Sequence, residues 1–184
     1  MFSRKDILHA IRGRDLVIKP FDRRMLLPNS LKIRLDSEIA TAKKGEIDPE
    51  KTKGYEKFYK VKRLKPKEKF VLKPQEFVLG RTLELFSLSR KVSALVHGRS
   101  TLARIGLAVT QSAPVIQAGH GVPKMRKLVL EMNNNGPFDI VLTPGMVIGQ
   151  MVFFKLDSPT DVLYDSFGMY GKRKEKDALI PLKE

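Results

Sequence analysis

The sequence predicts a mainly β fold, a sandwich or barrel, preceded by one short helix. After residue 13 the apolar residues occur in short runs rather than at helical spacing. The chain contains 13 glycines and 11 prolines, and many of them separate these runs. Its 184 residues suffice for one compact core and are too few to argue for two. We therefore expect a single domain over residues 1–184.

The N-terminal helix is expected over about residues 4–11. Ser3 can cap it, because a serine side chain accepts a hydrogen bond from a backbone N–H of the first turn. Ile7 and Ile11 then lie on one face, and Gly13 provides the C-terminal stop.

The remaining elements are expected to be strands. The apolar or alternating runs lie at 16–18, 31–35, 69–72, 77–79, 92–96, 128–132, 140–142 and 146–155. Short runs with frequent turn signals are typical of all-β sandwiches and barrels. The polar, lysine-rich stretch 42–67 predicts a long hairpin or surface insertion, and from about residue 168 a basic, flexible tail is expected.

The composition excludes several kinds of site. There is no cysteine, so disulfides, thiolate nucleophiles and cysteine-ligated zinc are ruled out. The three histidines, His9, His97 and His120, stand singly, which favours structural or surface roles, and no protein-bound metal is expected. No apolar run reaches the roughly 18 residues of a membrane span, and no export signal is evident, so we expect a cytoplasmic protein without membrane contact.

The formal net charge of +15, with a pI near 10.1, indicates a polyanionic partner or a well-solvated basic surface. Phosphorylated small molecules and nucleic acid both fit the first interpretation. Much of the excess lies between Lys43 and Lys73 and in residues 172–176. Charge alone does not choose between these interpretations.

The segment Gly98–Arg104 (GRSTLAR) offers two hydroxyls, Ser100 and Thr101, beside the cation Arg99. Backbone amides near a glycine, hydroxyl donors and a guanidinium together suit the oxygens of a phosphate. The alternative is the start of an ordinary helix capped by a hydroxyl, with both arginines on the surface.

Several segments together resemble one known family in order and spacing. They are PQEFVLGRT (74–82), GRSTLARIGL (98–107), LVLEMNNNGP (128–137), LTPGMVIGQMVFF (142–154) and, near the start, KDI (5–7), IKPF (18–21) and LPNS (27–30). This pattern resembles the family of deoxycytidine triphosphate (dCTP) deaminases and dUTP diphosphatases over nearly the whole chain.

The resemblance implies a dUTPase-like fold, a distorted, jelly-roll-like β-barrel that assembles as a homotrimer with nucleotide sites between subunits. It implies a nucleotide triphosphate as substrate, dCTP or also dUTP, with Mg²⁺ carried by the triphosphate. It places Arg99, Ser100 and Thr101 on the phosphates and Arg104 close to the nucleotide and the catalytic carboxylate. Tyr170 and Lys172 correspond to a lid that can reach phosphate oxygens.

Glu131 is the expected catalytic residue. On an alternating strand it points away from Leu130 and Met132, into an apolar setting that raises its proton affinity. Its place in LVLEM resembles that of the deaminase general acid and base, which takes a proton from the water that attacks C4 of cytosine. A solvent-facing strand glutamate is the alternative. Metal-dependent cytidine deaminases use cysteine ligands, which this chain lacks.

The sequence departs from the family in the loop before this glutamate. Gly121 stands where the resemblance leads us to expect an aspartate, and residues 118–127 contain no acid. Lys124, Arg126 and Lys127 make the loop basic instead. The departure weakens a diphosphatase activity most, since a glycine cannot activate water. Three functions stay open: dCTP deaminase, dUTP diphosphatase or bifunctional enzyme, and a non-catalytic relative that binds nucleotide or nucleic acid.

Overall fold

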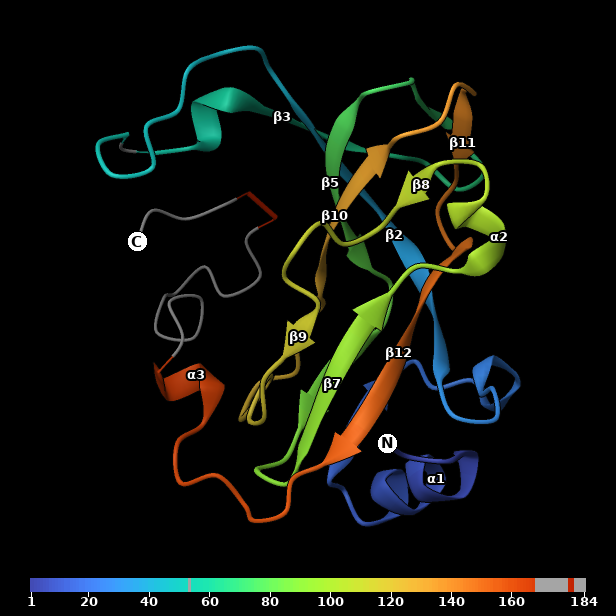
Figure 1. The fold of residues 1–184 in the computed structure, drawn as a ribbon, viewed down its shortest axis with the longest axis vertical. Coiled ribbons are helices and arrows are strands. Elements are labelled where there is room, and N and C mark those ends of the chain that lie inside the picture. The colour runs from blue at the N-terminus through green and yellow to red at the C-terminus, as the bar shows by residue number, and fades with distance from the viewer. Residues whose placement is uncertain (53, 168–178, 181–184) are drawn as a thin grey trace.

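The computed structural model describes residues 1–52, 54–167, 179 and 180 and has few helices and many strands (Figure 1). The helical elements are α1 (Arg4–Arg12), η1 (Arg23–Met25), η2 (Glu56–Phe58), α2 (Ser100–Ala103) and α3 (Tyr164–Phe167). The strands are β1 (Leu16–Lys19), β2 (Leu31–Ala42), β3 (Tyr59–Arg63), β4 (Phe70–Leu72), β5 (Phe77–Thr82), β6 (Leu85–Leu88), β7 (Val92–His97), β8 (Leu107–Ala108), β9 (Val115–Ile116), β10 (Val129–Asn134), β11 (Ile140–Leu142) and β12 (Val147–Lys155). The predicted mainly β fold with a short N-terminal helix is confirmed.

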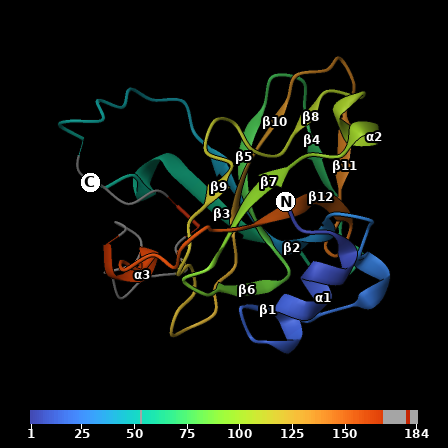
Figure 2. The ribbon, with the colours of Figure 1, turned by 60° about the horizontal axis from the view of Figure 1, so that its bottom comes forward.

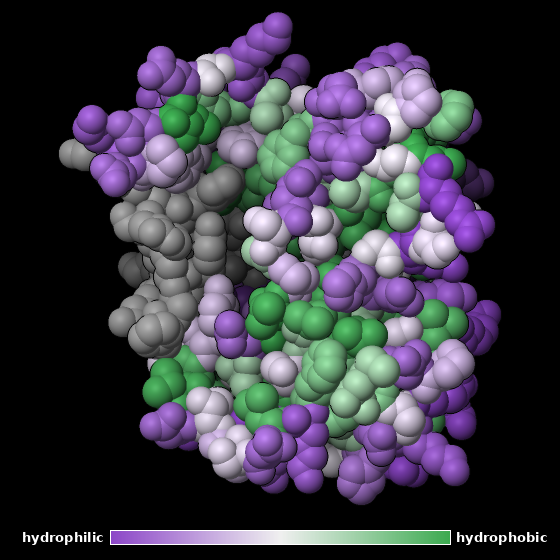
Figure 3. All heavy atoms as spheres, viewed as in Figure 1, coloured by the Kyte–Doolittle hydropathy of each residue, from purple (hydrophilic) through white to green (hydrophobic). Residues whose placement is uncertain are grey.

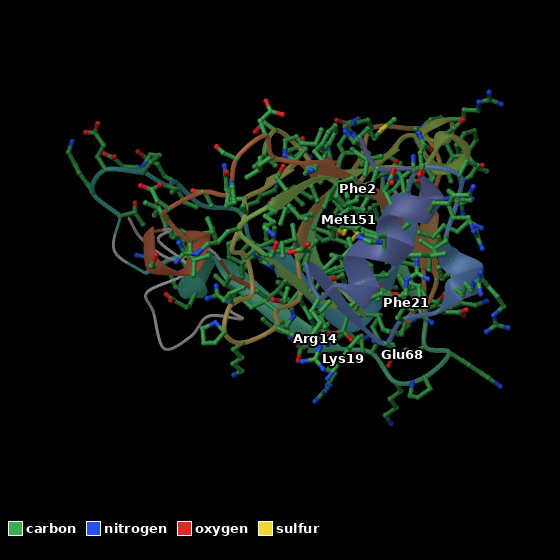
Figure 4. The ribbon with its side chains drawn as sticks, turned by 90° about the horizontal axis from the view of Figure 1, so that it is seen from below. Phe2, Arg14, Lys19, Phe21, Glu68 and Met151 are labelled. Carbon is green, nitrogen blue, oxygen red and sulfur yellow. The ribbon has the colours of Figure 1, made fainter. Side chains whose placement is uncertain are left out.

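The predicted cap of α1 is present. The Ser3 side chain accepts a hydrogen bond from the Asp6 backbone N–H, and the Asp6 carboxylate accepts one from the Ser3 backbone N–H, which completes a capping box. Gly13 is the C-cap with φ −77°, and the left-handed conformation falls instead on Arg14, at φ 60°. In the view from below, Phe2 and Met151 lie near one end of α1 and Arg14 beyond the other (Figure 4).

The main sheet has eight strands, in the order β8-β10-β5-β2-β12-β7-β9, with β3 added to β2. Two small antiparallel pairs, β1-β6 and β4-β11, accompany it. All the pairings are antiparallel, and β1, β6 and α1 lie together at one end of the molecule (Figure 2). One hydrophobic core connects α1 with the strands of all three sheets.

The stretch 42–67 is a hairpin extension, as expected, because β3 pairs with the C-terminal half of β2. In β3, every residue after Tyr59 is exposed, including Lys60, Lys62 and Arg63. No other strand in the described part of the chain is so exposed. An exposed edge rich in lysine discourages pairing with the strands of other molecules. The predicted tail from about residue 168 falls outside the described residues, except for Leu179 and Ile180. Among the described residues, no helix has the length and apolar character needed to cross a bilayer.

Candidate functional site

β10 directs Glu131 away from the core. Leu130 and Met132 are fully buried on its inner side, whereas Glu131 is half-buried on the outer side. The strand is fixed by β5, where Glu131 pairs with Leu79. The predicted alternation is therefore confirmed, and it presents the carboxylate on the outer face of the sheet.

Glu131 lines a cavity of about 350 Å³. The volume lies within the range of small-molecule sites. Its walls include the apolar side chains Phe77, Leu79, Val115, Ile116, Leu128 and Val129. Arg81, Arg126 and Lys127 also line it, and among its described lining residues Glu131 is the sole carboxylate. A cavity with apolar walls and a few charged side chains suits a small ligand that has both apolar and polar parts.

Burial raises the pKa of Glu131 above its usual range, while backbone hydrogen bonds involving Glu131 itself and Gln111 oppose the rise. A carboxyl group with a raised pKa accepts a proton more readily than an ordinary glutamate does. The predicted effect of the apolar setting is confirmed, and the group is suited to general acid–base chemistry.

Two of the cavity's cations are paired with acids. Arg81 forms an ion pair with Glu38, and Lys127 forms one with Asp36. These pairs hold the guanidinium and ammonium groups at the wall of the cavity. Lys124, by contrast, is exposed, so of the three basic loop residues only Arg126 and Lys127 reach the cavity.

The loop before β10 lies against β6. Phe86 and Arg126 exchange two backbone hydrogen bonds, of 2.7 and 3.0 Å, and the Leu88 N–H donates to the His120 carbonyl over 2.9 Å. Arg126 is only 2% exposed and His120 only 8%. The attachment to β6 therefore turns both side chains inward, where they line the cavity.

His120 was not distinguished by sequence from the other single histidines. Its imidazole lies against the ring of Tyr164, with centroids 6.0 Å apart and planes inclined by 33°. Burial, with a contribution from Arg126, lowers the pKa of His120 to about 4, so the ring is neutral at pH 7. The signal that could have marked it is the flanking pair Gly119 and Gly121, because glycine readily adopts a positive φ and both residues do so here.

Gly121 cannot carry a side chain in this conformation. Its φ is +71°, and an added Cβ would overlap the carbonyl oxygen of Phe86. An aspartate is thus excluded at this position by both backbone strain and contact with β6.

The predicted phosphate-binding segment lies elsewhere. Arg99 is the N-cap of α2, but its side chain makes no capping hydrogen bond, and Ser100, Thr101 and Arg104 are exposed. None of the four lines the Glu131 cavity. In Figure 1, α2 lies at the right edge of the ribbon and β9 nearer its centre. Within one chain the structure does not bring this segment and Glu131 together.

Tyr170 and Lys172, expected on the lid, lie outside the described residues. Among the residues that are described, no three histidine or acidic side chains gather in a way that could hold a metal ion.

Comparison with known proteins identifies the family. Residues 1–156 match the family described as dCTP deaminase-like. The chain belongs to this dCTP deaminase-like family. The match covers β10 with Glu131, the 118–127 loop and α2, whereas Tyr164, which also lines the cavity, lies beyond it.

Relatives of this dCTP deaminase-like chain extend over most of its length. It is 35% identical over 169 residues to "dCTP deaminase, dUMP-forming" of Corynebacterium diphtheriae, which covers 90% of this chain and 87% of the relative. It is 36% identical over 181 residues to the protein of the same name from Beutenbergia cavernae. This alignment covers 94% of this chain and 88% of the relative.

A solved structure agrees on the fold. The 2'-deoxycytidine 5'-triphosphate deaminase of Agrobacterium tumefaciens superposes with a TM-score of 0.63 at 21% identity. The superposition covers 83% of this chain and 46% of that one. The dUTPase-like fold expected from the resemblance to the family of dCTP deaminases and dUTP diphosphatases is thereby confirmed.

Proposed function

We propose that this chain deaminates dCTP hydrolytically, with Glu131 as the general acid and base. The observation that carries the proposal is a half-buried carboxylate of raised pKa, facing a cavity that has apolar walls and is also lined by Arg81, Arg126 and Lys127. The curated relatives bear the name dCTP deaminase, which supports the same substrate. No cysteine is present, so the cysteine-ligated zinc mechanism is closed to this chain.

Glu131 would take a proton from a water molecule as the hydroxide adds to C4 of cytosine. It would then deliver that proton to the ring nitrogen N3 and move a further proton from the added hydroxyl to the amino group. The C4–N bond breaks and ammonia leaves, so dCTP and water give dUTP and ammonia. A carboxyl group whose pKa is raised can serve in both directions within one turnover.

The triphosphate would be bound by a second copy of the chain. Arg99, Ser100 and Thr101 have the donors that phosphate oxygens need, yet they do not line their own chain's Glu131 cavity. One nucleotide can reach both groups if they come from neighbouring subunits. We accordingly propose a homotrimer with shared sites, with Arg104 near the nucleotide and Mg²⁺ carried by the triphosphate.

An apolar row supports this assembly. Val115 of β9 pairs with Leu95 of β7, which pairs with Val152 of β12, and these side chains lie on the outer surface of the sheet. Val115 is 52% exposed. Figure 3 shows apolar side chains gathered on this face over β7 and β12. Because Val115 also lines the Glu131 cavity, a copy covering the row would reach the cavity's edge.

The test is incubation of the purified protein with dCTP and, separately, with dUTP in the presence of Mg²⁺, followed by measurement of nucleotides and free ammonia. Glu131→Gln should bind dCTP and release no ammonia, because the amide keeps the shape but transfers no proton. Glu46→Gln, an exposed glutamate in the β2–β3 extension, is the matched control and should keep full activity. Ammonia release that persists in Glu131→Gln would contradict the mechanism.

Formation of dUMP is the second candidate, and the names of the relatives favour it, since they read dUMP-forming. Against it, residues 118–127 contain no acid and Gly121 has no room for one. The same incubation decides, because dUMP and pyrophosphate would appear beside ammonia. If neither nucleotide changes, the exposed basic strand β3 becomes the site to test, by salt-dependent binding of an oligonucleotide.

A further inference from the structure

An exposed basic surface lies outside the Glu131 cavity. Residues 59–70 contain six cations and a single acid, Glu68. All six cations are exposed, and none of them lines the cavity. We call these residues the β3–β4 basic face; they are Lys60, Lys62, Arg63, Lys65, Lys67 and Lys69.

Most of this charge is not neutralised by the chain itself. Lys62 forms an ion pair with Glu68, with Nζ and Oε1 2.7 Å apart. The other five cations form no ion pair with any residue in the described part of the chain. An unbalanced excess of positive charge on one short exposed segment attracts polyanions.

The backbone holds the basic face in a defined shape. β3 is paired with β2, and the buried Leu64 fixes its end by donating its N–H to the Ser37 carbonyl over 2.8 Å. The turn that follows is closed by two hydrogen bonds. The Lys65 N–H donates to the Glu68 carboxylate over 2.8 Å, and the Glu68 N–H donates to the Lys65 carbonyl over 3.0 Å. In the view from below, Glu68 lies at the edge of the molecule (Figure 4).

The lysines of β3 face away from the Glu131 cavity. Tyr59 lines that cavity, so alternation along β3 turns Lys60 and Lys62 to the opposite face of the strand. Side chains two residues apart on one face of a strand are roughly 6.6 Å apart. Nucleic acid carries one phosphate per nucleotide along a continuous backbone, so a row of cations can contact several phosphates at once.

The apolar residues of the segment argue against a lipid surface as the partner. Val61 is 47% exposed, but it alternates with Lys60 and Lys62 and therefore lies on the other face of β3. The turn 65–69 contains only lysine, proline and glutamate. Segments that bind at a membrane interface combine their cations with large apolar side chains that enter the lipid, whereas phosphates in water require only the cations.

We propose that the β3–β4 basic face binds single-stranded nucleic acid through its phosphates, without reading the base sequence. A single strand is flexible, so it can follow the cations from β3 into the turn. This binding is separate from the proposed deamination, because it uses no residue of the Glu131 cavity.

The test is binding of a fluorescent single-stranded DNA of about 20 thymidines to the full chain, measured by anisotropy between about 50 and 200 mM salt. If most of the six cations contact phosphates, the logarithm of the association constant should fall against the logarithm of salt concentration with a slope of about −3 to −4. A strand of adenines should bind about equally, because no base is read.

The variant that tests the surface combines Lys60→Gln, Lys65→Gln and Lys69→Gln. Removing three charges should make the slope less negative by about 2 and lower the affinity at about 50 mM salt by at least about 10-fold. Lys65→Gln alone should change the slope by about 0.7, which keeps the surface testable if the triple variant does not fold.

The matched control combines Lys5→Gln, Lys91→Gln and Lys155→Gln. These three lysines are also exposed and form no ion pair within the described part of the chain. They lie in α1, before β7 and at the end of β12, at the opposite end of the ribbon from β3 (Figure 1). The control should keep the slope and affinity of the wild-type chain, and melting curves verify that both triple variants fold.

Three results would overturn the proposal. The first is no binding of the oligonucleotide at about 50 mM salt. The second is equal weakening by the two triple variants, because the net charge alone would then explain the binding. The third is displacement of the oligonucleotide by excess dCTP at constant ionic strength, which would place the strand at the nucleotide site.

Vesicles of phosphatidylserine are measured alongside the oligonucleotide. If the vesicles bind through Lys60, Lys65 and Lys69 while the oligonucleotide does not, the partner is a lipid surface and the proposal is wrong. Binding of the oligonucleotide that depends on these lysines, without comparable binding of the vesicles, supports it.

Discussion

An added Cβ on Gly121 would overlap the carbonyl oxygen of Phe86, so the loop before β10 can lie against β6 only with a glycine at this position. Gly121 also has φ +71°. The same attachment brings Arg126 and His120 into the cavity. The glycine that replaces an expected acid therefore supports the shape of the site.

Gly121→Ala should destabilise the protein, because both the positive φ and the Phe86 contact must be accommodated. Gly145→Ala is the matched control, since Gly145 has φ +83° and nothing within 4 Å of an added Cβ. Gly145→Ala should lower the free energy of unfolding by about 1 kcal/mol, and Gly121→Ala should lower it by about 1–3 kcal/mol more than that. Urea unfolding measures both, and equal losses would show that the Phe86 contact is unimportant.

Glu131→Gln should raise the melting temperature at neutral pH. Burial raises the pKa of Glu131 in the folded state, so its contribution to stability is fully present below the ordinary value of 4.5 and is lost as the pH rises through the raised pKa. At neutral pH the wild-type chain therefore carries a buried charge that glutamine removes. Melting curves from pH 4 to 8 should show that the increase in melting temperature becomes smaller as the pH falls. An increase that does not depend on pH would contradict this explanation.

The same pKa shift predicts the pH profile of deamination. The base must be ionised, so the rate should fall on the acid side through a pKa above the ordinary glutamate value. Initial rates of ammonia release across this range provide the measurement. An acid limb at or below 4.5 would mean that another group, or a relaxed site, controls the reaction.

Thr82→Val should destabilise the start of β10. The fully buried Thr82 hydroxyl accepts from the Leu128 N–H over 2.9 Å and donates to the Glu84 carbonyl over 2.8 Å. Valine leaves both groups without a partner, a cost of about 1–3 kcal/mol. Thr82→Ser keeps the hydroxyl and should lose about 0.8 kcal/mol for its missing methyl. If the two variants unfold at the same urea concentration, the hydroxyl contributes nothing.

Mixed trimers should reveal a shared site. Arg99→Ala and Glu131→Gln should each be inactive alone. When the two chains are refolded together in equal amounts, random assembly pairs an intact Arg99 with an intact Glu131 in about a quarter of the sites. Ammonia release should recover to about that fraction of wild type. No recovery, with mixed trimers verified by mass, would contradict sites between subunits.

Much of the fold could be predicted because the information is local. The α1 cap needs only Ser3 and Asp6, and each of the eight expected strands shows its own apolar run. Four strands, β3, β6, β8 and β9, were not predicted from an apolar run. β8 and β9 have two residues each, too few to show any periodicity, and β3 is exposed on both faces and so lacks apolar alternation.

The sequence by itself determined the mainly β fold and the outward direction of Glu131, because alternation along a strand is a property of neighbouring residues. Only the tertiary structure decided what shares the cavity with this glutamate. His120 and Arg126 enter it through hydrogen bonds to β6, and Tyr164 arrives from a distant segment. The separation of Arg99 from Glu131 likewise depends on how whole strands pack. Contacts between distant segments follow from the packing of the complete core, which no short stretch of sequence encodes.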